Sequence, residues 1–236
     1  MLLISGFSSN DQSTGQDSAT QQTETTETEA VTGASQASYT PLDQLQDKYD
    51  VIIVGAGGAG MTAALEAKEN GMNPVIFEMP SAGGNTNKSS SGMYASETKF
   101  QVEQGIKDSN DLFYDETLKG GKETNDTELL RYFVDNSASA IEWLDSKGIR
   151  VNNITITGGM SEKRTHRPED GSAVGQYLVN GLVRNVQEQD IPLFINADVK
   201  EITAQDGKVN GVNSVGDIIV FGHQAGAKAT EYVKAQ

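Results

Sequence analysis

The sequence predicts an α/β fold with a parallel sheet, helices on both faces of the sheet, a small β hairpin and a disordered tail in front. Two short apolar runs, Val51–Val54 and Pro74–Phe77, flank a stretch with helical periodicity over residues 61–70. This order of elements is typical of a βαβ unit, in which the two strands pair in parallel. A glycine-rich turn joins the first run to the helix, and Gly71 ends the helix.

Residues 1–45 are predicted to form a disordered polar spacer. Between Ser8 and Ser38 nearly all residues are small or polar, and such a segment buries too little apolar surface to offset the entropy cost of ordering it. The apolar start before it is too short to span a bilayer. It resembles the lipobox of bacterial lipoproteins with Phe7 in place of the lipidated cysteine. An ordinary disordered start is the alternative.

The composition of the chain argues against several classes of function. Lys and Arg number 18 against 33 Asp and Glu, a net charge of −15, so no nucleic-acid partner is expected. The chain has no cysteine, which excludes thiolate catalysis and Cys-ligated metal centres from these residues. Only two histidines are present, and no metal site is predicted.

The predicted domain spans residues 46–236, and its later elements follow from periodicity and turn residues. Amphipathic patterns and an Asp cap predict the helices, and apolar β-branched runs predict the strands. Asp206–Gly207 is a hairpin turn signal. The expected elements are one long helix over 127–146 ended by Gly148, a helix over 172–189, strands at 193–195 and 199–202, the hairpin return from Val209, and a final helix over 214–233.

The turn after the first strand, Gly55-Ala56-Gly57-Gly58-Ala59-Gly60, has the G-x-G-x-x-G spacing of a Rossmann-like dinucleotide site. Gly55 permits the tight turn, Gly57 lets a pyrophosphate approach the backbone, and Gly60 allows the helix to pack closely on the strand. The amides of the first helical turn, at Gly58 and Ala59, then face the phosphates.

Glu78 ends the second strand, close to the spacing of about 20 residues expected for a carboxylate that binds the ribose hydroxyls. The long polar loop over 83–93 favours FAD over NAD, because an extended FAD lies along backbone amides and short side chains. An NAD-dependent dehydrogenase is the alternative.

The chain from Tyr49 to Val212 resembles the flavin domain of the soluble fumarate reductase family, which includes flavocytochrome c and urocanate reductase relatives. The residues that carry the resemblance are the glycine loop, Glu78, Gly84–Asn85, Ser91–Met93, the run 117–121, Gly158–Gly159 and the run 164–168. The resemblance implies FAD contacts at Ala59, Glu78, Asn85, Thr86, Ser91, Gly92 and Val199, and at Ser214 and Val215 at the start of a helix facing the flavin.

In that family a long segment separates the counterparts of Val212 and Asn213, which are adjacent here. The segment contains the capping domain, the arginine that protonates fumarate, and further substrate ligands. Arg164, His166 and Arg167 are the remaining substrate-side candidates. A solvated loop that supports the flavin site is the other interpretation of these three residues.

The resemblance implies an FAD-dependent oxidoreductase acting on CH–CH groups, which reduces a small unsaturated dicarboxylate such as fumarate. The electron donor would be a reduced quinone-, flavin- or haem-linked carrier, and the location the extracellular face of a bacterial membrane. Because the capping segment is absent, we expect this chain to be catalytically incomplete. A non-catalytic FAD-binding or electron-carrying module is the alternative function.

Overall fold

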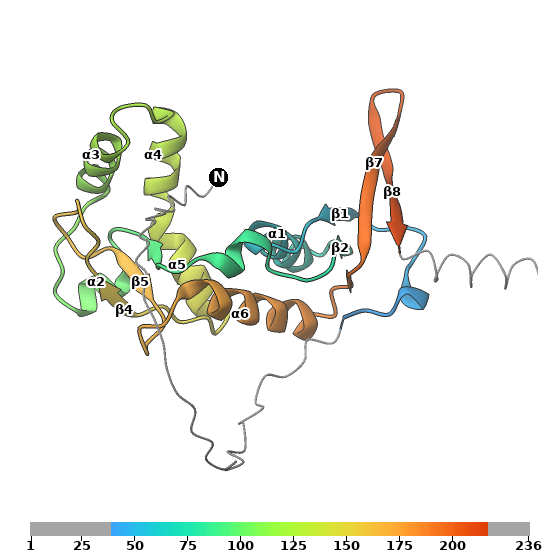
Figure 1. Cartoon of the computed structure of the whole chain (residues 1–236), viewed down its shortest axis with the longest axis horizontal. Coiled ribbons are helices and arrows are strands. Elements are labelled where there is room, and N and C mark those ends of the chain that lie inside the picture. Colours follow the sequence, from blue (N-terminus) through green and yellow to red (C-terminus); the bar gives the residue numbers. More distant parts are fainter. Residues whose placement is uncertain (1–38, 217–236) are drawn as a thin grey trace, which may run out of the picture. The chain divides into compact units, whose positions relative to one another are not determined.

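The structure is a computed structural model that describes residues 39–216 (Figure 1). The predicted lipobox-like start, the spacer up to residue 38 and the last twenty residues lie outside the described residues. The described elements are η1 Leu42–Gln44, β1 Val51–Val54, α1 Gly58–Glu69, β2 Pro74–Phe77, η2 Gly84–Lys88, β3 Met93–Tyr94, α2 Lys99–Glu103, α3 Asn110–Gly120, α4 Thr127–Asp135, α5 Ser137–Ser146, β4 Asn153–Thr155, β5 Thr165–Arg167, α6 Val174–Glu188, β6 Leu193–Phe194, β7 Ala197–Gln205 and β8 Lys208–Gly216, where η marks a 3-10 helix.

Strands β1, β2 and β6 form a parallel sheet in that order. Val51 lies opposite Pro74 and Ile76 lies opposite Leu193. All four residues of β2 are buried, because the strand has a neighbour on each edge and packing on each face. The predicted α/β fold and its βαβ unit are confirmed.

Strand β1 differs from the continuously buried strand that its sequence predicts. Ile52 is 37% exposed and Val54 is 55% exposed, whereas Ile53 packs against the core. Side chains alternate between the two faces of a strand, and only one face of β1 is covered by described residues. The apolar run therefore predicted the strand correctly but overestimated its burial.

The two faces of the sheet are covered differently. On one face, Ile76 packs with Leu65 of α1 and Leu182 of α6 in the largest apolar cluster. On the other face, the rings of Phe77 and Phe194 stack with their centroids 5.7 Å apart. The described neighbours of that aromatic pair come from the η1 segment and the β7–β8 hairpin. Among the described residues, helices α1 and α6 thus share one face.

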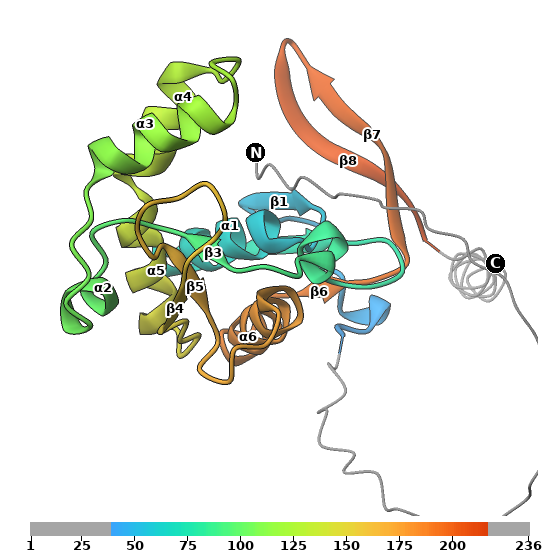
Figure 2. The same ribbon diagram turned by 60° about the vertical axis from the view of Figure 1, so that its left-hand side comes forward.

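The single helix predicted over 127–146 is wrong, because the chain forms two helices separated at Asn136. The Asn136 side chain donates a hydrogen bond back to the carbonyl of Tyr132 at 2.7 Å. Short polar side chains compete with the helical backbone in this way. Asp126 caps α4 as predicted, accepting from the amide of Leu129 at 3.0 Å. Helices α3 and α4 lie side by side in Figures 1 and 2.

Strands β7 and β8 form a long antiparallel hairpin (Figure 2). Asp206 and Gly207 have φ values of 53° and 75°, the left-handed conformations that a two-residue hairpin turn requires. The hairpin prediction is confirmed. Strand β8 continues to Gly216, so the prediction that a helix begins at Ser214 is wrong, because residues 213–216 pair with the start of β7 instead.

The described chain is attached to the sheet from its first residues. The Thr40 amide donates to the Leu193 carbonyl at 3.0 Å, and the Leu193 amide donates to the Thr40 hydroxyl at 2.9 Å. Residues 39–45, which the sequence places at the end of the spacer, therefore belong to the domain.

A substitution at Leu182 tests whether the largest apolar cluster is the main core. Leu182→Ala removes a fully buried side chain and is expected to lower the free energy of unfolding by about 2–5 kcal/mol. Val209→Ala, at a position 70% exposed on the hairpin, is expected to change it by less than about 0.5 kcal/mol. Urea denaturation of both variants checks this, and equal losses would contradict the assignment of the core.

Candidate cofactor site

The glycine loop between β1 and α1 is held by two close backbone contacts. Gly55 has a φ of 105°, which favours glycine, and its amide donates to the Phe77 carbonyl at 2.8 Å. A Cβ on Gly60 would overlap the carbonyl oxygen of Gly55. Gly60 therefore allows the first turn of α1 to rest on the end of β1, as predicted.

Gly57 differs from these two, because no described protein atom requires a glycine there. Its φ is −75°, which any residue adopts. A Cβ on Gly57 would lie 3.9 Å from Thr86 Oγ1 and 4.0 Å from the Gly83 carbonyl oxygen, ordinary contact distances. A ligand that approaches the backbone at Gly57 would account for the glycine, so this position fits a pyrophosphate.

The Glu78 carboxylate lies beside the same loop. Its Oε2 accepts from the Ala56 amide at 2.6 Å, and its Oε1 accepts from the Met79 amide at 2.7 Å. A carboxylate oxygen has two lone-pair sites, so each oxygen can accept a second hydrogen bond. The position at the carboxyl end of β2 suits an acceptor for ribose hydroxyls.

The small polar loop is brought against the glycine loop. The Gly83 amide donates to the Ala56 carbonyl at 2.8 Å, and the Gly58 amide donates to Thr86 Oγ1 at 3.0 Å. Asn85 is exposed in η2. The Gly58 amide, which was predicted to face the phosphates, donates to the Thr86 hydroxyl in this structure.

Ser91 and Gly92 follow η2 and lie next to strand β5. A Cβ on Gly92 would lie 2.5 Å from the carbonyl oxygen of His166 and 2.7 Å from Thr165 Cγ2. Gly92 therefore permits a close approach to β5 that no other residue allows. The predicted cofactor loop and the predicted substrate-side segment are neighbours.

Val199 lies in β7, opposite Ser214 of β8, and Val215 lies opposite Asp198. The Ala197 amide donates to the Glu78 carbonyl at 2.9 Å, which places the start of β7 beside the end of β2. Ser214 and Val215 are therefore strand residues near Val199. The prediction that they present amides at the start of a helix is wrong. Their extended backbone is paired with β7, which excludes the helix start.

The segment 164–168 is not a solvated polar loop, so that interpretation is wrong. Thr165–Arg167 forms β5, the central strand of an antiparallel sheet with β3 and β4. Arg164 and His166 are both buried. A polar sequence becomes buried here because each of these two side chains finds specific partners.

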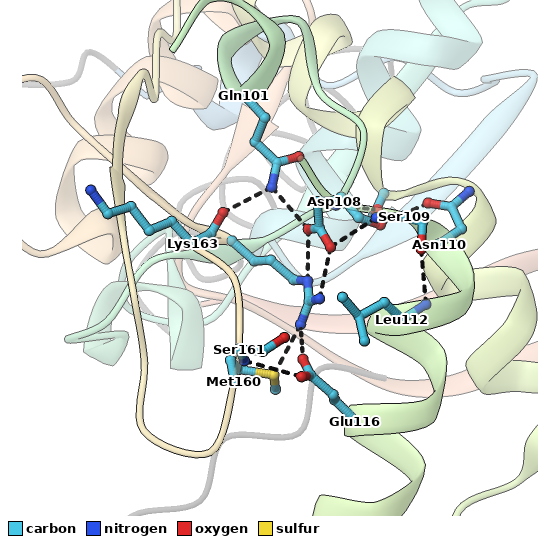
Figure 3. A network of polar contacts seen from close by, with 12 residues as sticks. Gln101, Asp108, Ser109, Asn110, Leu112, Glu116, Met160, Ser161 and Lys163 are labelled. Carbon is cyan, nitrogen blue, oxygen red and sulfur yellow. Dashed lines mark hydrogen bonds and ion pairs between the residues drawn. The ribbon is translucent and has the colours of Figure 1, made fainter. Parts of the chain in front are cut away.

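Arg164 is fully engaged with two acids (Figure 3). Its Nε and Nη2 each donate to the Asp108 carboxylate at 2.7 Å, a two-point ion pair. Its Nη1 contacts Glu116, and its guanidinium lies 5.2 Å from the centroid of the Phe113 ring. The amide of Ser161 donates to the other oxygen of Glu116 at 3.0 Å. Arg164 is therefore not free to bind a dicarboxylate.

The network favours the charged forms of Arg164 and Glu116. Burial by itself lowers the pKa of Arg164, but the hydrogen bonds that Arg164 donates to Asp108 and Glu116 raise that pKa above its usual value. Burial raises the pKa of Glu116, but hydrogen bonds from Arg164 and Ser161 outweigh it and leave the pKa lowered. The ion pair is a structural connection between α3, the preceding loop and β5.

His166 is also hydrogen-bonded through both ring nitrogens. Its Nε2 lies 2.8 Å from Thr98 Oγ1, and its Nδ1 lies 2.8 Å from the Arg164 carbonyl oxygen. Burial lowers the pKa of His166 despite opposing hydrogen bonds. The neutral form is thus favoured, and both ring nitrogens have partners.

Arg167 retains donor capacity. Its Nη1 reaches only the Gly171 carbonyl, at 3.5 Å, and its Nε is buried without a hydrogen-bond partner among residues 39–216. Of the three substrate-side candidates, Arg167 is the one whose guanidinium can accept an anionic ligand.

Sequence reasoning missed three residues near the site. Asp108 and Glu116 gave no signal, because acids are common in this chain and their partner is distant in sequence. Gly175 packs on the cofactor loop at the start of α6. A glycine inside a helical pattern is a signal of close packing that could have identified it.

Comparison with known proteins identifies the family of the chain. The family model described as FAD binding domain matches residues 50–229. The chain belongs to this FAD binding domain family. Membership confirms FAD as the predicted cofactor and leaves the NAD-dependent alternative without support.

This chain is similar in sequence to several reductases. It is 53% identical over 176 residues to the NADH:fumarate oxidoreductase of Klebsiella pneumoniae (strain 342), covering 74% of this chain and 19% of that protein. It is 34% identical over 168 residues to the fumarate reductase (cytochrome) of Shewanella frigidimarina, covering 70% of this chain and 29% of that protein.

A solved structure of a flavocytochrome c3 fumarate reductase in an open conformation has the same fold. It matches with a TM-score of 0.65 and 33% identity, and the match covers 71% of this chain and 32% of that chain. The chain thus spans about a fifth to a third of the length of the relatives it matches.

Arg164 tests the buried network. Arg164→Met leaves the Asp108 carboxylate buried without its partner and is expected to cost about 3–5 kcal/mol of unfolding free energy. Lys200→Met is the control, since Lys200 is more than half exposed and pairs with Asp198 on the surface, and it is expected to cost less than about 1 kcal/mol. Thermal and urea unfolding measure both, and a small loss for Arg164→Met would contradict a structural role.

Protonation of His166 makes the free energy of unfolding depend on pH, in a direction that its pKa shift determines. Its folded pKa lies below its unfolded value, so the unfolded state binds the proton first as the pH falls. The contribution of His166 to the free energy of unfolding is constant above about pH 6.5. As the pH falls further, this contribution decreases by at most about 1.4 kcal/mol per pH unit, until the pH passes the folded pKa. His166→Gln is expected to flatten this slope between about pH 5 and 6.5. An unchanged slope would show that His166 is not the group responsible.

Proposed function

We propose that this chain is the FAD-binding part of a fumarate-reductase-like oxidoreductase, which reduces the double bond of a small unsaturated dicarboxylate. The observation that supports it most is the open approach at Gly57, next to the Glu78 carboxylate, in a chain of the FAD binding domain family.

The cofactor-binding residues of the proposal come from four segments. They are Gly55, Gly57, Gly58, Ala59 and Gly60 of the glycine loop, Glu78 at the end of β2, Asn85, Thr86, Ser91 and Gly92 of the polar loop, and Val199 of β7. The positive end of α1 favours the anionic diphosphate. Glu78 accepts from the ribose hydroxyls, and its charge disfavours a 2′-phosphate.

FAD when bound supplies the hydride for reduction of a carbon–carbon double bond. The chain's own residues bind and orient that group, and Arg167 is the proposed anchor for a substrate carboxylate. Arg164 and His166 are excluded from this role, because their polar atoms are occupied within the protein. The electron donor is proposed to be a reduced quinone-, flavin- or haem-linked carrier.

A second function, a non-catalytic FAD-binding or electron-carrying module, is favoured by one observation. Two of the three candidate substrate ligands are locked into internal contacts, and Arg167 offers no second carboxylate clamp within the described residues. Addition of fumarate to the flavin-loaded chain with a reduced dye separates the two functions. Reoxidation of the dye supports the reductase, and a bound flavin without reoxidation supports the module.

An extracellular location is proposed from the polar residues 8–38 and the lipobox-like start alone. No helix within residues 39–216 combines the length and apolar character needed to cross a bilayer. Fractionation of cells that express the chain tests the location, and recovery only in the cytosolic fraction would contradict it.

Gly57 tests the cofactor site. Gly57→Ala creates no clash in the protein. Gly57 is the N-cap of α1, where alanine is less favourable than glycine, so the variant's unfolding free energy is expected to stay within about 1 kcal/mol of wild type. The added methyl group meets the diphosphate, and the Kd for FAD is expected to rise at least about tenfold. Fluorescence quenching of FAD measures the Kd.

Gly120→Ala is the matched control, because a Cβ there meets no atom within 4 Å at the end of α3, away from the loop. Its Kd for FAD is expected to equal that of wild type. Unchanged FAD binding in Gly57→Ala would contradict the proposed site.

A further inference from the structure

The first turn of α6 contacts the polar loop that the proposed function assigns to the cofactor. The Val174 amide donates to the Ser91 carbonyl at 3.2 Å, and the Gly175 amide donates to the Ser89 carbonyl at 3.1 Å. The first amides of a helix have no partner within the helix. Helix α6 uses two of them to hold two carbonyls of the loop.

Gly175 allows this contact because it has no side chain. A Cβ on Gly175 would lie 2.5 Å from the Thr86 carbonyl oxygen, 2.7 Å from that of Ser89 and 2.9 Å from that of Asn87. All three are main-chain atoms, so no rotamer change relieves the overlap. Any larger residue requires the loop and the helix to separate.

The contact fixes the direction of the loop amides. The carbonyl and N–H groups of one trans peptide point in opposite directions, and the described chain has no cis peptide. Because the Ser89 and Ser91 carbonyls point toward α6, the amides of Ser90 and Gly92 point away from it. Helix α6 therefore orients hydrogen-bond donors on the opposite side of the loop.

We propose that Gly175 is a positioning residue for cofactor binding, which acts by holding the 86–92 loop in its donor-presenting conformation. The inference rests on the proposed FAD function for its binding consequence. It goes beyond that function, because Gly175 is separate from the glycine loop and contacts only the protein.

Two variants and one control test the proposal. Gly175→Ala introduces the overlap with the loop. Val174→Pro removes one loop hydrogen bond at the first helical position, where proline is tolerated, and Ala173, with φ −63° and ψ 134°, already has the conformation required before proline. Gly181→Ala, on the same helix, meets Ile149 side-chain atoms at 2.6 and 2.8 Å and is far from the loop carbonyls.

The first measurement is the Kd for FAD of the full chain, with circular dichroism and thermal unfolding as checks of folding. Gly175→Ala and Val174→Pro are expected to raise the Kd by about tenfold or more. Gly181→Ala is expected to lower the unfolding midpoint and leave the Kd near the wild-type value. Similar Kd values for Gly175→Ala and Gly181→Ala would overturn the proposal.

The second measurement needs no cofactor. Lys88 is exposed within the loop, so trypsin can cut after it when the loop separates from α6. Gly175→Ala and Val174→Pro are expected to be cut after Lys88 faster than wild type and Gly181→Ala. Equal rates in all four proteins would overturn the positioning role. If wild type does not bind FAD, the proposed function is wrong. The cleavage rates at Lys88 would still decide whether Gly175 holds the loop against α6.

Discussion

The close approach of α1 to the end of β1 is the constraint on which the site depends. Gly60 lies so near the Gly55 carbonyl that no Cβ fits between them, and this contact sets where the helix begins. The start of the helix in turn places the Gly58 amide on Thr86 and leaves the backbone open at Gly57. An anion-binding helix terminus is effective only if backbone reaches the ligand without side chains between them.

Glycines have three different roles around this site, and the structure separates them. Gly60, Gly92 and Gly175 are required by neighbouring protein atoms, and Gly55 is required by its positive φ. Gly57 has neither requirement, which makes it the position where a ligand explains the residue. The distinction matters for experiments, because loss of FAD binding at Gly60 would follow from misfolding, whereas loss at Gly57 would not.

The buried ion pair of Arg164 changes how the substrate side of the molecule is understood. A guanidinium is a natural clamp for a dicarboxylate, but Asp108 and Glu116 already occupy this one (Figure 3). The pair connects α3 to β5, and β5 supports Gly92 in the cofactor loop. Arg164 therefore has a structural role next to β5, and Arg167 keeps its donor capacity.

Local sequence determined the βαβ unit, the glycine loop, Glu78 and the hairpin turn, because apolar runs, positive-φ glycines and turn residues act over a few neighbouring positions. Only the tertiary structure decided the burial of Arg164 and His166, the half-exposed face of β1 and the strand conformation of Ser214. These depend on partners outside the local sequence, such as Asp108 for Arg164, 56 residues away. A polar residue is buried only when such a partner satisfies it, and its own sequence neighbourhood does not contain that information.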